Sequence, residues 1–143
     1  MLGGSETYLL TRRPEDKFYW MKSCMKVNIY SGELQVMSPM TVARYENMSA
    51  CHMGIHIYVI GGIDSKLKTL KTSARFNLLT NKWTQIPNEI PTDLTCGIAS
   101  AAVKKRFILM FGGKNWSNFD CRDDSEVIIR IDTLNLHRTW TVI

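Results

Sequence analysis

Any metal chemistry in this sequence would have to use cysteine and histidine side chains that lie far apart in the chain. The candidates are Cys51, His52, Cys96, Cys121 and His137. Zinc ligands usually come in close pairs that set the geometry of the site, and here only Cys51 and His52 are close. Adjacent residues of a strand point to opposite faces, so this pair does not converge on one ion. Free cysteines pack as small hydrophobic side chains. We therefore expect structural cysteines, no metal and no cofactor.

Acid–base or cation chemistry would use the carboxylates Asp120, Asp123 and Asp124, which follow Gly113. Closely spaced carboxylates suit a divalent cation or a basic partner. The calcium-loop pattern, with its fixed glycine and terminal glutamate, is absent, which favours a solvated loop. The sequence also contains no GxSxG, GxGxxG or P-loop motif. We therefore expect that the protein is not an enzyme.

A third candidate group of functional residues is the basic segment 66–71, which also contains apolar residues. Lys66, Lys68 and Lys71 alternate with Leu67 and Leu70. A run of lysines is usually a solvated surface, but leucines on a surface loop indicate a contact with another molecule. This segment is therefore a candidate partner-binding loop.

The composition excludes several classes of function. Hydrophobic residues make up 45% and charged residues 22%, which is typical of a globular chain. The net charge of +5 is modest and the basic residues are scattered, with short clusters at 12–13, 66–71 and 104–106, so we expect no nucleic-acid binding. No apolar run approaches the ~18 residues of a membrane span, and no signal-peptide pattern opens the chain, so we expect no membrane association. Four cysteines without a CxxC pair indicate reduced thiols in the cytoplasm or nucleus.

The elements that position these residues are revealed by two glycine pairs. Gly61-Gly62 and Gly112-Gly113 each close an apolar run, and a tryptophan follows each pair, at Trp83 and Trp140. A period near 50 residues is a signature of repeat architecture. Glycine suits these positions because it tolerates positive φ and close backbone approach.

Each unit predicts four short strands. We expect strands at 47–53, 56–60, 71–76 and 82–86 in the central unit, at 98–103, 106–111, 126–131 and 139–143 in the last, and at 26–30 and 34–37 in a partial first unit. In that first unit Gly3-Gly4 takes the glycine position and Leu34 the tryptophan position. Four strands per ~50 residues fit one blade of a propeller, with small residues on the inner strand and a tryptophan between blades.

At these residues the sequence resembles the Kelch repeat family. Phe76 and Trp83 have the family's aromatic-to-tryptophan spacing, and 40–44 is similar to its methionine-to-arginine link between blades. The resemblance implies an all-β, Kelch-type β-propeller fragment of about three four-stranded antiparallel blades. The expected units are 1–39 (a degenerate first blade), 40–94 (the second blade and its linker) and 95–143 (the third blade). The sequence departs from the pattern at Leu34, at Ile131 where an aromatic is expected, and at Leu94 where Arg44 stands one repeat earlier.

The resemblance also implies a protein-interaction module. Loops between second and third strands and loops between blades would form its binding face. The polar contacts expected there are Arg44, Lys66, Lys68, Lys71, Asp120, Arg122 and Asp123. Many family members recognise substrates for ubiquitin ligases, and some associate with actin or the cytoskeleton. A propeller-based enzyme or metalloprotein is the alternative.

Closure of the ring is the remaining question from the sequence. Propellers generally use 4–8 blades, and this sequence carries fewer than three. Either the sequence is a piece of a longer Kelch protein, or the ring is completed by association. We favour the piece, because an open set of blades leaves apolar strands such as 98–103 at an unpaired edge.

Overall fold

The protein is described by a computed structural model over residues 22–44, 47–64, 66–92, 95–114, 128–137 and 140–143. Within these ranges the chain forms strands and turns, with no helix. The described strands are β1 (Cys24–Val27), β2 (Leu34–Met37), β3 (Met48–Met53), β4 (His56–Gly61), β5 (Ser73–Asn77), β6 (Lys82–Ile86), β7 (Ala99–Val103), β8 (Phe107–Phe111), β9 (Ile128–Asp132) and β10 (Thr141–Val142).

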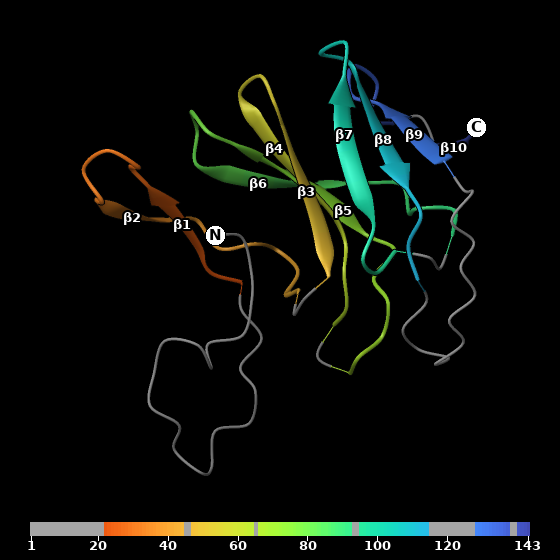
Figure 1. The fold of residues 1–143 in the computed structure, drawn as a ribbon, viewed down its shortest axis with the longest axis horizontal. Coiled ribbons are helices and arrows are strands. Elements are labelled where there is room, and N and C mark those ends of the chain that lie inside the picture. The colour runs from red at the N-terminus through yellow and green to blue at the C-terminus, as the bar shows by residue number, and fades with distance from the viewer. Residues whose placement is uncertain (1–21, 45–46, 65, 93–94, 115–127, 138–139) are drawn as a thin grey trace.

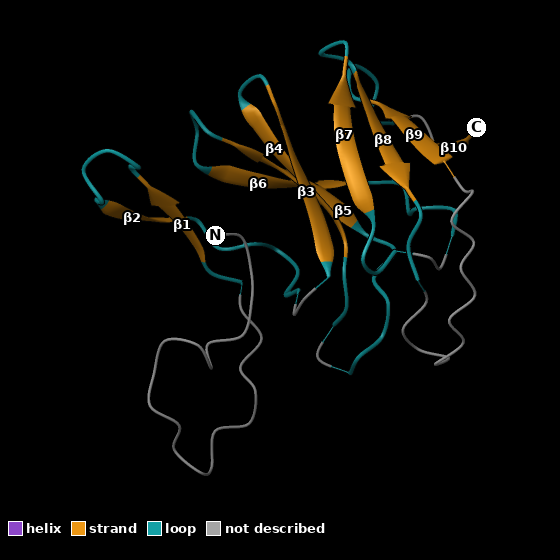
Figure 2. Cartoon of the chain, viewed as in Figure 1, coloured by secondary structure: helices purple, strands orange, loops and turns teal. Residues whose placement is uncertain are grey.

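The strands form three antiparallel sheets that stand side by side (Figures 1 and 2). We call β1–β2 the first blade, β3–β6 the second blade and β7–β10 the third blade. Each strand pairs only with its neighbours in the sequence, so every sheet is a meander. The predicted all-β class and the two four-stranded sheets are thereby confirmed.

The inner strands of the second and third blades lie next to each other. β3 and β7 are in contact, and the hydroxyls of Ser49 and Ser100 are 2.6 Å apart across the gap. Small side chains permit this approach because the first strands of successive blades are crowded near the axis of the ring. The sequence predicted small residues there for that reason.

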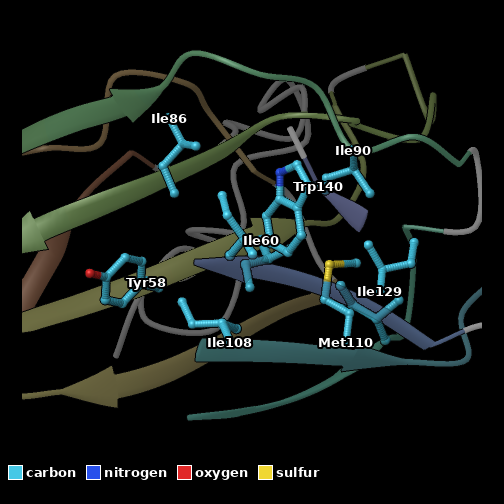
Figure 3. Packing of buried hydrophobic residues seen from close by; sticks show 10 residues of the cluster. Tyr58, Ile60, Ile86, Ile90, Ile108, Met110, Ile129 and Trp140 are labelled. Atoms are coloured by element: carbon cyan, nitrogen blue, oxygen red, sulfur yellow. The ribbon is translucent and has the colours of Figure 1, made fainter. Parts of the chain in front are cut away.

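A hydrophobic cluster fills the space between the second and third blades (Figure 3). The second blade and its linker contribute Tyr58, Ile60, Ile86 and Ile90, and the third blade contributes Ile98, Ile108, Met110, Ile129, Ile131 and Trp140. Fully burying one such aliphatic side chain contributes about 1.5–3 kcal/mol, so this cluster holds the two blades together.

A second cluster joins the first blade to the second. Cys24 and Met40 are buried against Val59, with Trp83 packed at the side. The indole Nε1 of Trp83 also donates a hydrogen bond to the carbonyl of Ser38 at 2.9 Å. Trp83 and Trp140 therefore each pack toward the preceding blade, as the sequence predicted for a side chain that fills the gap between blades.

The first blade differs from the prediction in one respect. The expected strand at 26–30 is instead β1, which ends at Val27. The side chain of Asn28 accepts hydrogen bonds from the backbone N–H groups of Tyr30 and Ser31, which closes a turn rather than extending the strand. Tyr30 is exposed in this turn.

Several further expectations concern residues that the structure does not describe. Gly3-Gly4 and the start of the strand predicted at 126–131 are among them. The unit boundaries at 39/40 and 94/95 stay predictions.

Candidate functional site

The loops predicted to bind a partner gather at one end of the blades. Because the sheets are meanders, the loop from β4 to β5, the residues after β8 and the linkers between blades all lie at this end. It is the lower end in Figure 2, where the loops are teal. We call it the loop face. Its described parts are 38–44, 62–64, 66–72, 87–92, 95–98 and 112–114.

The glycine pair of the second blade fixes this face to the next blade. Gly61 has a φ of 65° and Gly62 a φ of 93°. A Cβ atom on Gly61 would lie 2.0 Å from the backbone oxygen of Thr95. That same oxygen accepts a hydrogen bond from the N–H of Gly62 at 2.8 Å. The side-chain hydroxyl of Thr95 donates to the carbonyl of Leu70 at 2.6 Å. Thr95, in the linker between the second and third blades, is therefore hydrogen-bonded to both ends of the loop from β4 to β5.

Arg44 lies inside this end of the second blade rather than on its surface. Its side chain is 1% exposed and donates to the carbonyl of Gly61. It also donates to the hydroxyl of Thr72, with a distance of 3.0 Å between Nη2 and Oγ1. Burial lowers the pKa of Arg44 to about 10, so the guanidinium stays charged at neutral pH. The prediction of a surface contact at Arg44 is therefore wrong, because the side chain is buried. Arg44 instead supports the loop from β4 to β5, since it donates hydrogen bonds to the Gly61 carbonyl at the end of β4 and to the Thr72 hydroxyl before β5.

Asp64 makes several hydrogen bonds within the described part of the loop from β4 to β5. Its carboxylate accepts hydrogen bonds from the backbone N–H groups of Lys66 and Lys68, at 2.7 and 2.9 Å. The backbone N–H of Leu67 donates to the carbonyl of Asp64, and that of Asp64 donates to the carbonyl of Lys68. An isolated bridge between Ile63 and Thr69 closes the base of the loop.

Leu67 stands at the tip of this loop with an unusual backbone. Its φ is 58°, in the left-handed region that costs an L-residue about 1–2 kcal/mol. Its side chain is 45% exposed, and the exposed Lys66 and Lys68 flank it. A strained, exposed apolar residue between two cations is an arrangement that a ligand can use, and such strain persists only where the surroundings enforce it.

The other predicted contacts divide into two groups. Lys71 is half-buried, and its carbonyl accepts a hydrogen bond from the N–H of Ile90, so it belongs to the support of the linker. Asp120, Arg122 and Asp123 lie outside the described residues. Sequence reasoning missed Asp64, although an aspartate followed by polar residues is a readable signal for a side-chain-capped turn.

The opposite end of the third blade carries a second basic group. Lys104 and Lys105 form the turn between β7 and β8, and each has a φ of 50°. Arg106 forms an ion pair with Asp132 at 2.7 Å and lies 4.9 Å from the ring centroid of Phe107. This turn provides a charged site remote from the loop face.

The described cysteines and histidines do not converge. Cys24 and Cys96 are buried, and burial raises the pKa of the Cys24 thiol. Cys51 packs against the cluster between the blades, whereas its neighbour His52 is exposed. No group of three or more His, Cys, Asp or Glu residues in the described ranges could hold a metal ion. None of the described segments is a helix that could cross a membrane.

Comparison with known proteins identifies one repeat and the fold. Residues 44–88 match the family model described as the Kelch motif. The fold is similar to the solved structure of YjhT, with a TM-score of 0.66 and 13% sequence identity. The match covers 85% of this chain and 44% of that chain, so it spans less than half of the YjhT structure. No curated protein matches the sequence.

Proposed function

Because this chain carries a Kelch motif and folds as part of a Kelch-type β-propeller, we propose that it is a protein-interaction module that binds a protein partner through its loop face. The observation that carries the proposal is the tip formed by Lys66, Leu67 and Lys68. Propellers use rigid blades to present variable loops, and binding residues are concentrated on such loops.

The chemistry of the tip defines the kind of partner. Leu67 offers an apolar side chain, and the two lysines offer positive charge on either side of it. A protein segment with an apolar residue between acidic ones complements this surface. Asp64 holds the loop before the partner arrives, so little conformational entropy is lost on binding.

The two lysines contribute through charge, so a double charge reversal tests the site. We expect K66E/K68E to abolish partner recovery in a quantitative affinity capture from cells that express the protein. The matched control is K104E/K105E, which makes the same change of charge at the opposite end of the third blade. It should recover the same partner as the wild type.

A third variant separates loop shape from loop charge. Asp64→Ala removes the acceptor that holds the backbone of Lys66 and Lys68, but it leaves both lysines and Leu67 in place. We expect partial loss of recovery. Equal recovery by the wild type and K66E/K68E would refute the proposed site, and equal loss in K66E/K68E and K104E/K105E would assign the effect to net charge alone.

Finer roles implied by the family stay predictions. These are substrate recognition for a ubiquitin ligase, attachment to actin, residence in the cytoplasm or nucleus, and the absence of catalysis. Co-sedimentation with actin filaments tests the second of them. Metal analysis of the purified protein tests the alternative of a propeller-based metalloprotein.

A further inference from the structure

The end of the blades opposite the loop face carries an equivalent turn in each of the three blades. Because the sheets are meanders, the turns from β1 to β2, from β3 to β4, from β5 to β6 and from β7 to β8, and the turn that follows β9, all lie at this end. We call it the turn face, and it is the upper end in Figure 2. These turns lie within single blades, so they are built without any contribution from a neighbouring blade.

A side-chain cap shapes the outer turn of every blade. The residue that opens each turn is an asparagine or an aspartate, and its Oδ1 accepts a hydrogen bond from the backbone N–H two residues later. The three pairs are Asn28 with Tyr30 at 3.0 Å, Asn77 with Leu79 at 2.9 Å, and Asp132 with Leu134 at 3.1 Å. Each cap therefore fixes the backbone of one apolar residue at the tip of its turn.

The apolar residue at each tip is exposed. Tyr30 is 93%, Leu79 is 76% and Leu134 is 75% exposed. Leu79 belongs to the second blade, which has a blade on either side, so its exposure is a property of the blade itself. Ile55 in the turn from β3 to β4 is also exposed, and its carbonyl accepts a hydrogen bond from the N–H of Leu78, which ties the two turns of the second blade together. A repeated, hydrogen-bonded presentation of apolar side chains to solvent indicates a contact surface.

Positive charge surrounds these tips. Lys82 stands three residues after Leu79 and is exposed, as are Lys104 and Lys105 in the turn of the third blade. The described charges of the turn face are Lys82, Lys104, Lys105 and Arg106 against Glu33 and Asp132, and Arg106 is already paired with Asp132 at 2.7 Å. The balance is positive, so the charge of the turn face complements an anionic surface.

From this we propose that the turn face docks on an anionic lipid surface, with the tips of Tyr30, Leu79 and Leu134 in the headgroup region and the lysines facing the lipid charges. Protein interfaces are organised around side chains packed together in a buried centre, whereas these tips come from turns of three different blades. A lipid surface is extended and fluid, so it receives separate tips at once, and its affinity adds apolar burial to electrostatic attraction. The amphipathic ring of tyrosine suits the same depth.

This contact needs no segment that spans a membrane. The expectation of no membrane association rested on the lack of such a segment and of a signal peptide, and neither pattern reports on side chains at the tips of turns. The turn face is also separate from the loop face, so one molecule could hold a protein partner at one end and a lipid surface at the other. The inference therefore goes beyond the proposed function and does not rest on it.

Co-sedimentation of the purified protein with lipid vesicles tests the proposal. We expect binding to vesicles of phosphatidylcholine and phosphatidylserine in roughly equal parts, much weaker binding to phosphatidylcholine alone, and a decline with added salt. L79S/L134S removes two apolar tips without changing the charge and should weaken binding by about tenfold or more. Leu67→Ser makes the same kind of change on the loop face and should leave vesicle binding unaltered.

Two charge reversals separate the turn face from net charge. K104E/K105E should weaken vesicle binding by about tenfold or more, whereas K66E/K68E makes the same change of charge on the loop face and should bind vesicles like the wild type. The expected pattern is the reverse of that for recovery of the protein partner, so failure of one proposal is distinguishable from failure of the other.

Three outcomes overturn the proposal. No binding of the wild type to the mixed vesicles leaves the turn face to a protein partner. Equal loss in K104E/K105E and K66E/K68E assigns vesicle binding to net charge alone. Undiminished binding by L79S/L134S means that the apolar tips do not enter the lipid. Urea midpoints equal to that of the wild type establish that each variant is folded, and the changed side chains are exposed, so we expect this equality.

Discussion

Substitution of Gly61 by alanine is the sharpest test of how the second blade is joined to the third. Alanine at a φ of 65° costs about 1–2 kcal/mol for the left-handed backbone. Its Cβ atom would also lie 2.0 Å from the oxygen of Thr95, so the linker must move. Movement of Thr95 breaks its hydrogen bonds to Gly62 and Leu70, each of which contributes about 0.5–1.5 kcal/mol. We therefore expect a loss of about 2–5 kcal/mol in the free energy of unfolding.

The chain supplies matched controls for this measurement. Gly112 and Gly54 have φ values of 62° and 61°, but a Cβ atom on either would meet nothing within 4 Å. Gly112→Ala and Gly54→Ala should therefore cost only the backbone strain of about 1–2 kcal/mol. Thr95→Val isolates the hydroxyl bond to Leu70 and should cost about 1 kcal/mol.

Urea denaturation followed by tryptophan fluorescence measures all four variants, and equal slopes of the free energy against urea show that the unfolded states are comparable. If Gly61→Ala loses no more stability than Gly112→Ala, the close approach of Thr95 does not restrain the linker. The explanation given for the glycine pair would then be wrong.

Three further substitutions address buried or titrating groups. Arg44→Met removes the buried donor to the Gly61 carbonyl and should lower the free energy of unfolding by about 2 kcal/mol; no loss in urea denaturation would mean that another group satisfies this oxygen. Ser73→Ala removes a buried hydroxyl that has no partner among the described residues, so it should leave stability unchanged or raise it by about 1 kcal/mol. A clear loss in the same assay would contradict this reasoning. Burial and the nearby Arg75 lower the pKa of His56 below 6.5, so the folded state holds this proton less tightly than the unfolded state. Its stabilising effect is present above pH 6.5 and lost as the pH falls through the folded pKa. His56→Gln should therefore flatten the fall in urea midpoint on acidification, and an unchanged pH profile would count against this assignment.

Local patterns in the sequence predicted most of the strands. The predicted strand at 82–86 coincides with β6, and those at 56–60 and 106–111 differ from β4 and β8 by one residue. Each of these segments is a short apolar or alternating run bounded by glycine or turn residues, so its signal is local. The strand predicted at 26–30 was wrong because the side chain of Asn28 caps a turn.

The candidate site was harder to predict than the strands. Lys66 and Lys68 are exposed on the loop face as predicted, and their binding role stays a prediction. Arg44 is buried, because the oxygens of Gly61 and Thr72 lie 17 and 28 residues further along the chain and come together only when β4 and β5 pair. In the sequence, nothing distinguishes Leu67 from another leucine in a loop. Its left-handed backbone and its hydrogen bond to the Asp64 carbonyl are visible only in the structure.

The sequence by itself determined the repeating blade. Within about fifty residues, the glycine pairs, apolar runs and spaced tryptophans predict the strands and the turns of one blade. They can do so because each strand or turn depends mainly on residues that are close in the sequence. Only the tertiary structure decided that Arg44 supports the loop rather than contacting a partner, and that the close approach of Thr95 requires glycine at position 61. Those facts depend on how one blade meets the next. Side chains buried between blades contact residues that are far away in the sequence. A local sequence pattern therefore does not predict which of these residues a given side chain will contact.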